Sequence, residues 1–373
     1  MWRSLLLSVF TLLVLNARAQ DNKPWAGFGI EANYIAGHAF KHSKNIKVDF
    51  PASSPAFDLN FVLQTHGTKD WQQRRKYPVI GLGVAYTIYD NNVVYGKCLS
   101  IYPNIRIPFI TGKKLEWSAK AGYGLGYISK IFERYPSWDT TNSVMSSHLN
   151  NYTYIATELR YRVNEHLDIQ AGVNFSHVSN AALRSPNLGI NKYGAHIGIR
   201  YSPVTSMPNR TIRDLPKLKN RIMFQVRFGI SGSEMGTADG PMNPIYSYSA
   251  FVSRRYAGKN KLYIGADYAY YKNIYMFLKN NEVDPGHEKS NSTKSAIFVG
   301  NEFLLGRIGI IFQAGYYIHK GMLTDYPVYE KLGGNVYLLQ QEKGIIKELT
   351  LHCYLKAHLA TAELAEMGIG AAF

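Results

Sequence analysis

The sequence predicts an all-β fold, a transmembrane antiparallel β-barrel of about 14–16 strands. The first observation is an N-terminal export signal, and the second is hydrophobicity that alternates with a period of two over many segments. The third is that no stretch after the export signal approaches the roughly 20 apolar residues of a membrane helix. Although 46% of the chain is hydrophobic, that hydrophobicity is dispersed, which favours strands.

The export signal occupies residues 1–19. Arg3 supplies a positive charge, residues 5–15 form an apolar core, and Ala17-Arg18-Ala19 has the small-x-small pattern of a cleavage site. We therefore expect the mature chain, residues 20–373, to be the barrel. The two cysteines, Cys98 and Cys353, are far apart and lie in strand-like segments, so we read them as small buried or lipid-facing residues.

The strands are recognised by their alternation. In residues 153–163, apolar side chains such as Ile155 fall on one face, whereas Glu158, Arg160 and Arg162 fall on the other. Charges in such positions require a wet interior in which they neutralise one another. About sixteen such segments can be counted, an even number within the range of these barrels. They start near residues 25, 57, 77, 95, 114, 151, 166, 192, 221, 246, 261, 296, 307, 331, 347 and 364.

The connections between these segments fall into two classes that mostly alternate, as periplasmic turns and extracellular loops should. The long connections are residues 41–56, 134–150, 180–191, 234–245 and 273–292. Residues 203–220 break the alternation, because they form a long, proline-containing connection on the short-turn side. We therefore divide the barrel into residues 20–203, a linker at 204–220, and additional barrel strands at 221–373.

The formal charge of +16 calls for anionic partners. Nucleic acid is excluded for an exported protein, and phosphorylated lipid head groups fit the charge better. The basic residues cluster at 74–76, 113–114 and 210–221, which we read as turns beside anionic lipid. A merely solvated basic surface is the alternative.

A soluble β-sandwich would also show alternating strands. Against it stand the export signal, the 28 tyrosines, which barrels place in interfacial girdles, and a last strand that ends on an aromatic residue, Phe373. We therefore expect a bacterial outer-membrane location.

The segment with the strongest chemical signal is residues 175–191, FSHVSNAALRSPNLGIN. His177 and Ser179 continue the outward series of their strand, so they should face lipid, and Asn191 shares the outward parity of the next strand. A histidine beside a serine can act as general base to a nucleophile. The alternative is a strand end in the head-group layer, followed by a turn.

This segment resembles the signature of the outer-membrane lipid A 3-O-deacylase (PagL) and acyloxyacyl hydrolase family, in which His-x-Ser-Asn-Ala precedes Pro-Asn-x-Gly and an acidic residue. The matching positions are His177, Ser179, Asn180, Ala181, Pro186, Asn187 and Gly189. The resemblance implies that Ser179 is the nucleophile and His177 the base. It also implies that Asn187 donates to the oxyanion, with Asn180 and Gly189 shaping the site.

Asn191 occupies the position of the family's acidic residue, so it would be a neutral third catalytic member. The implied function is hydrolysis of an acyl ester of lipid A, part of lipopolysaccharide in the outer leaflet, without metal or cofactor. The alternative is a non-catalytic barrel, either a porin-like channel or a scaffold with a decayed site. Its lumen residues, which could line a pore or plug it in pairs, would be Glu158, Arg160, Arg162, Arg227, Asp267, Lys356 and His358.

Overall fold

The computed structural model describes residues 25–133, 135, 140–204, 210–216, 220–234, 238, 240–358 and 361–373. The expected signal peptide, residues 1–19, and the expected mature start at Gln20 lie outside these residues. The described strands are β1 (Phe28–Phe40), β2 (Ala56–Gln64), β3 (Val79–Ile88), β4 (Lys97–Thr111), β5 (Leu115–Ile128), β6 (Leu149–Arg162), β7 (Leu167–Ser179), β8 (Ile190–Tyr201), β9 (Ile222–Ser233), β10 (Asn243–Tyr256), β11 (Asn260–Tyr271), β12 (Thr293–Leu305), β13 (Ile308–His319), β14 (Val328–Gln340), β15 (Glu348–His358) and β16 (Thr361–Ala372).

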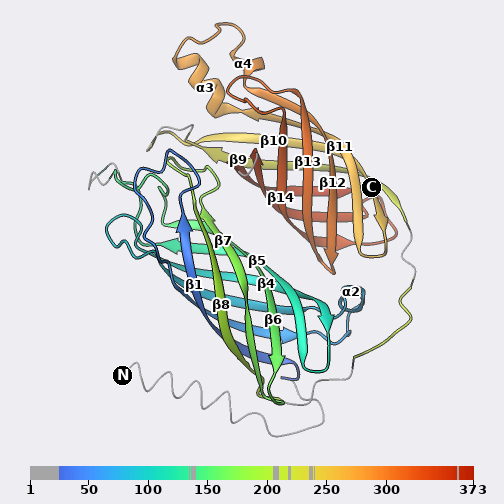
Figure 1. Cartoon of the computed structure of the whole chain (residues 1–373). Helices are drawn as coiled ribbons and strands as arrows, with labels where there is room; N and C mark the ends of the chain where they lie inside the picture. The colour runs from blue at the N-terminus through green and yellow to red at the C-terminus, as the bar shows by residue number, and fades with distance from the viewer. Residues whose placement is uncertain are drawn as a thin grey trace, which may run out of the picture.

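The strands close into two barrels of eight, each built from antiparallel neighbours (Figure 1). In the first barrel β8 pairs with β1, for example Ile197 opposite Tyr34. In the second barrel β16 returns to β9, for example Ile369 opposite Phe228. Closure pairs the edge strands of each sheet, so neither barrel exposes a free edge to lipid.

The prediction of sixteen antiparallel barrel strands is confirmed by the described residues, and every predicted strand start lies close to an observed one. The structure differs from the expected single ring in where the sheet closes. Alternation specifies which face a side chain occupies, but it does not specify which strand closes on the first. The first eight strands already form a complete ring, so β9 starts a second one.

The two ends of the barrels differ in the length of their connections. The end that carries the long connections holds α3 (Lys272–Asn280) and α4 (Glu288–Asn291), which lie above the second barrel in Figure 1. We call it the outer rim. The opposite end carries short turns together with α2 (Asp70–Arg74), and we call it the inner rim.

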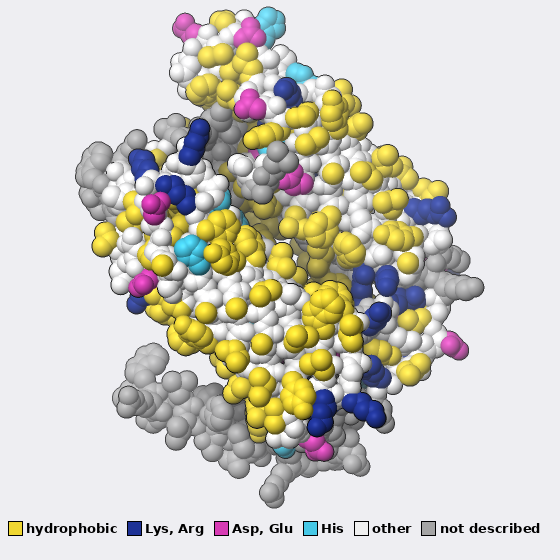
Figure 2. Space-filling view, in the orientation of Figure 1, with side chains coloured by type: hydrophobic (Ala, Val, Ile, Leu, Met, Phe, Trp, Pro, Cys, Tyr) yellow, Lys and Arg dark blue, Asp and Glu magenta, His cyan; other side chains and the backbone are white. Residues whose placement is uncertain are grey.

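The outward faces of both barrels are apolar (Figure 2). On β6, Ile155 and Leu159 are about half exposed, whereas Glu158 between them is buried. A bilayer would cover this apolar surface, as the alternation predicts. Among the described residues, no helix combines the length and hydrophobicity needed to cross a membrane.

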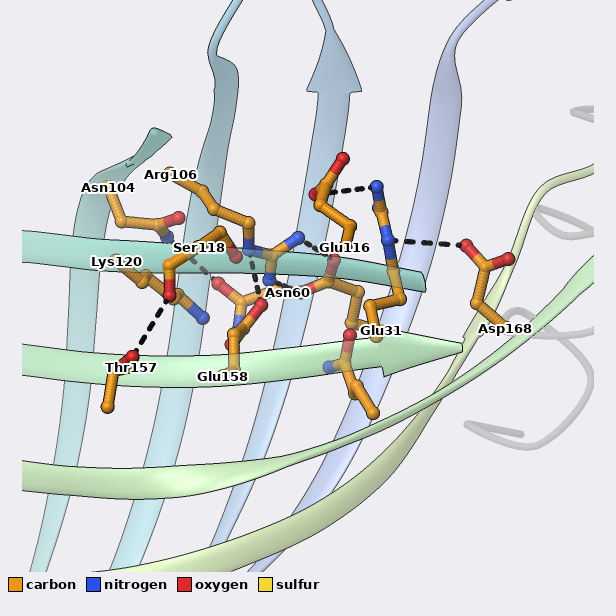
Figure 3. Close-up of polar contacts among 12 residues, drawn as sticks. Glu31, Asn60, Asn104, Arg106, Glu116, Ser118, Lys120, Thr157, Glu158 and Asp168 are labelled. Atoms are coloured by element: carbon orange, nitrogen blue, oxygen red, sulfur yellow. Dashed lines mark hydrogen bonds and ion pairs between the residues drawn. The ribbon is translucent and has the colours of Figure 1, made fainter. Parts of the chain in front are cut away.

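The lumen of the first barrel is filled by paired charges (Figure 3). Arg106 makes a two-pronged contact with Glu31, at 2.6 and 2.8 Å, and also pairs with Glu158. His196 Nε2 lies 3.6 Å from the second Glu158 oxygen, and the hydroxyl of Tyr102 donates to Asp58 at 2.6 Å. These side chains are almost fully buried, so they fill the interior of the barrel at this level.

The second barrel is filled in the same manner. Lys331 lies 3.3 Å from Asp267 and 3.1 Å from Glu366. The Arg227 guanidinium sits 4.2 Å from the centroid of the Phe251 ring, a cation–π contact that replaces an ion pair. The charges predicted to lie in the lumen are therefore paired or stacked. Arg162 at the inner rim is also paired, with Asp168, but its side chain is half exposed.

The barrels touch each other at the inner rim through α2 and the turn after it. The Arg75 guanidinium donates to Lys259 O at 2.6 Å, to Asn260 Oδ1 at 2.9 Å and to Leu304 O at 3.3 Å, all in the second barrel. Arg74 donates to Pro216 O at 2.7 Å. These two arginines of the 74–76 cluster thus bind the rest of the chain, where lipid contacts were expected. The pKa of Arg75 is lowered, chiefly because burial at this contact disfavours its charge.

We predict that Arg106→Met lowers the free energy of unfolding of the protein by about 3–5 kcal/mol, because it leaves Glu31 and Glu158 buried without their main counter-ion. The measurement is denaturant unfolding in detergent micelles. Arg162→Met is the matched control: its pair with Asp168 spans 3.7 Å and its side chain is 54% exposed, so the loss should stay below about 1 kcal/mol. Equal losses in the two variants would contradict the assigned role of the lumen network.

Candidate active site at the outer rim of the first barrel

The predicted site residues come together at the outer rim, where β7 ends and β8 begins. We call the connection between these strands, residues 180–189, the site loop. His177 and Ser179 lie two residues apart near the end of β7, and their side chains share the outward face because strand side chains alternate. Asn191 is the register partner of His177 on β8.

His177 is oriented by its cross-strand partner. Its Nδ1 lies 2.5 Å from the side-chain oxygen of Asn191. An amide oxygen can only accept a hydrogen bond, so Nδ1 carries the proton and Nε2 keeps its lone pair. Nε2 is the atom that a general base at this position would use.

Ser179 has the predicted parity but not the predicted exposure, because only 2% of it is accessible. Asn151, its register partner on β6, donates from Nδ2 to the Ser179 hydroxyl at 3.3 Å and to the Ser179 carbonyl. Among the described residues, the Ser179 hydroxyl makes no hydrogen bond to His177. Catalytic hydrogen bonds are often long before substrate binds and tighten afterwards.

Gly189 brings the site loop against both catalytic candidates. Its φ is +74°, a left-handed conformation that favours glycine. A Cβ added there would lie 2.7 Å from His177 Cε1 and 3.3 Å from Ser179 Cβ. Only a residue without a side chain allows the backbone to pass this close.

Asn180 and Asn187 stabilise the site loop by side-chain hydrogen bonds. The Asn187 side-chain oxygen accepts the Asn180 backbone N–H at 3.0 Å, which leaves the Asn187 Nδ2 group as its donor. The Asn180 side chain donates to Arg184 O and to Ser146 Oγ, both at 3.1 Å. Asn180 therefore braces the loop, and Asn187 is the residue of the pair with a donor to offer.

The site rests on a packed platform of outer-rim loops. Ile46, Val144 and Met145 are fully buried and belong to the same apolar cluster as strand residues of the first barrel. Tyr95 in the connection between β3 and β4 stacks on Phe50 with 4.3 Å between ring centroids. Burial, with a contribution from Asp49, raises the pKa of Tyr95 to about 12, so its hydroxyl stays neutral.

The outward surface beside the site is aromatic. Phe175 and Tyr193 are register partners and both are exposed, and the ring of Phe40 lies 5.7 Å from that of Tyr193. His38 stands edge-on to Tyr193 at 5.6 Å. This surface runs from the site toward the region that lipid would cover.

Two site neighbours were missed from the sequence. Asn151 could have been found only from a hairpin centred on Glu165, which places position 151 opposite position 179; a turn centred between Asn164 and Glu165 would pair position 151 with 178. His42, whose Nε2 lies 2.9 Å from Leu188 O, could not, because it belongs to a long loop distant in sequence. Within the described chain, no group of three or more His, Cys, Asp or Glu residues is arranged to hold a metal ion.

Several solved structures resemble the chain. "Crystal structure of the outer membrane enzyme PagL" is 21% identical, with a TM-score of 0.32, over 46% of this chain and 97% of that one. Neisserial surface protein A (NspA) is 13% identical, with a TM-score of 0.33, over 48% and 97%. A Rhodopseudomonas blastica porin triple mutant is 11% identical, with a TM-score of 0.20, over 92% and 99%. No curated protein matches the chain in sequence.

Two family models match the chain, one in each barrel. Residues 56–200, which include the His177–Asn191 segment, match the model described as lipid A 3-O-deacylase (PagL). Residues 220–373 match the model described as acyloxyacyl hydrolase, C-terminal domain. The first barrel therefore belongs to the lipid A 3-O-deacylase (PagL) family over residues 56–200, and the second barrel is an acyloxyacyl hydrolase C-terminal domain over residues 220–373.

Proposed function

We propose that this protein sits in the bacterial outer membrane and hydrolyses an ester-linked acyl chain of lipid A in the outer leaflet. The observation that carries the proposal is the hydrogen bond from His177 to Asn191 beside Ser179, on the outward face of a strand that matches the deacylase family. The substrate of a site on this face must itself reside in the membrane.

The first chemical step is formation of an acyl-enzyme. The Ser179 hydroxyl attacks the ester carbonyl carbon and its proton passes to His177 Nε2. The carbonyl oxygen becomes an oxyanion that accepts a hydrogen bond from Asn187 Nδ2. Collapse of this intermediate breaks the ester C–O bond, and His177 returns its proton to the departing sugar hydroxyl.

The second step reverses the roles. A water molecule gives a proton to His177 and attacks the acyl-enzyme, and the fatty acid leaves as Ser179 recovers its proton. Asn191 holds the imidazole in the required tautomer through both steps. Being neutral, it stabilises the imidazolium less than a carboxylate would.

The surroundings suit a phosphorylated lipid. The acyl chain would lie along the exposed rings of Phe175 and Tyr193. Exposed basic side chains on the outer-rim loops, among them Lys44, Lys47 and Arg184, offer partners for phosphate groups. Since only 2% of Ser179 is accessible, the substrate must displace part of the site loop to reach it.

A channel is disfavoured, because buried ion pairs fill the interior of both barrels. A scaffold with a decayed site remains the competing function, and the observation behind it is Asn191 in the family's acidic position. Activity measurements on variants of the site separate it from a working hydrolase.

We predict that Ser179→Ala leaves the barrels folded and lowers lipid A deacylation by at least about 1,000-fold, because the nucleophile is lost. The measurement is mass spectrometry of lipid A incubated with each protein in detergent micelles. Ser176→Ala, which removes a hydroxyl from the lumen face of the same strand, should keep wild-type activity. Equal deacylation by wild type and Ser179→Ala would refute the proposed nucleophile.

We predict that Gly189→Ala abolishes most activity, because the new methyl group would collide with the His177 ring. The control is Gly286→Ala. Gly286 also has a positive φ, +90°, but nothing lies within 4 Å of its added Cβ, so the backbone penalty is matched without the collision. If both variants lose the same activity in the deacylation assay, the close approach to His177 is irrelevant to function.

We predict that Asn191→Glu raises deacylation, because a carboxylate stabilises the imidazolium as well as the tautomer, and that Asn191→Ala lowers it. The loss of charge in a serine protease triad costs on the order of 10⁴ in turnover, chiefly through the tautomer, so the gain here should be far smaller. All three proteins are compared in the same membranes. A wild type that is active, insensitive to alanine and damaged by glutamate would exclude Asn191 as the third member.

A further inference from the structure

The second barrel reaches the site loop through one residue, Glu234, directly after β9. The Glu234 backbone N–H donates to Leu183 O at 3.3 Å, and its Oε2 accepts the Ser185 N–H at 2.9 Å. Its other carboxylate oxygen lies 3.8 Å from Arg184 Nε. Among the described residues, the hydrogen bonds and ion pairs between the site loop and the second barrel all involve Glu234.

These contacts form a clamp around Arg184. One hydrogen bond holds the residue before it and another holds the residue after it, while the ion pair holds its side chain. Glu234 is only 6% accessible, so its carboxylate is shielded from water and its bond to the Ser185 amide is charge-assisted. Such a bond contributes more than one between neutral groups.

The site loop needs an external anchor because its start is strained. Ala181 and Ala182 have φ values of +56° and +62°, a conformation that residues other than glycine, asparagine and aspartate rarely adopt. Two successive residues of this kind persist only where surrounding contacts hold them. The clamp lies immediately after them and immediately before Pro186-Asn187, so it fixes the loop on the side that leads to Asn187 and Gly189.

The loop's other anchors come from the first barrel. Gly189 N–H donates to Val144 O at 3.1 Å, and the Asn180 amide donates to Ser146 Oγ. They hold the two ends of the loop. The middle, residues 183–185, is held by Glu234, two residues before the proposed oxyanion donor.

We propose that Glu234 of the second barrel is a positioning residue for the site on the first, so that the second barrel completes the active site. The catalytic consequence rests on the proposed function, whereas the effect on the loop does not. In this role the second barrel contributes to the active site without forming a pore and without touching the substrate.

The test compares wild type with Glu234→Ala, Glu234→Gln and Asp325→Ala in detergent micelles. Asp325 is an exposed carboxylate of another outer-rim loop, between β13 and β14, and serves as the matched control. Amide hydrogen exchange over residues 180–189 measures how firmly the site loop is held, and kcat and KM for lipid A deacylation measure the activity of the site. Heat-modifiable migration on gels verifies that each barrel is folded.

Glu234→Ala should speed exchange over residues 180–189 by about tenfold, because the Ser185 amide loses its acceptor. It should lower kcat by about 10- to 100-fold with little change in KM, since a misplaced Asn187 acts on the transition state. Glu234→Gln keeps an acceptor and loses only an ion pair to a half-exposed arginine, so it should stay within about threefold of wild type in both measurements. Asp325→Ala should match wild type.

If hydrogen exchange over residues 180–189 is unchanged in Glu234→Ala, Glu234 does not anchor the site loop. If exchange is faster but kcat is unchanged, Glu234 anchors the loop but has no role in catalysis. If wild type does not deacylate lipid A, the proposed function fails, and the exchange arm alone then decides whether Glu234 positions the loop.

Discussion

Every backbone amide and carbonyl within a membrane must find its partner inside the protein, and closure of each sheet meets that constraint here. Closure by β8 on β1 and by β16 on β9 gives two small rings. Eight strands enclose just enough space for side chains. The interior of each ring is therefore a core of large polar side chains, and the surface that faces lipid is the apolar one.

The filled interiors determine where chemistry can take place. Arg106, Glu31 and Glu158 satisfy one another across the first lumen, which leaves that space closed to a substrate. Reactive groups can then act only at the rims or on the outer surface. Ser179 and His177 lie at the rim and on the outer surface at once, because they stand at the outer end of a strand and on its outward face. Under the proposed function, the acyl chain and the sugar head group of the substrate meet at this position.

In a chain with two barrels, contacts from one barrel can hold the loops of the other in place, whereas a single small barrel must supply all such contacts itself. Arg75 joins them at the inner rim, and Glu234 joins them at the outer rim. The outer contact falls on the site loop, which carries consecutive alanines in a left-handed conformation. Strain of this kind is tolerated when the surroundings over-determine the backbone, and here part of the surroundings belongs to the other barrel.

The sequence alone determined the number of strands and their faces, and it singled out the segment of the candidate site, because a period of two and a short motif are local properties. Tertiary structure decided the rest. Whether sixteen strands make one ring or two depends on which edges pair, and alternation is identical in both cases. Ser179 has the parity of a lipid-facing residue, yet Asn151 and Gly189 cover it. Glu234 belongs to the site loop's surroundings only because the second barrel lies beside the first, a relation between distant segments that no local pattern encodes.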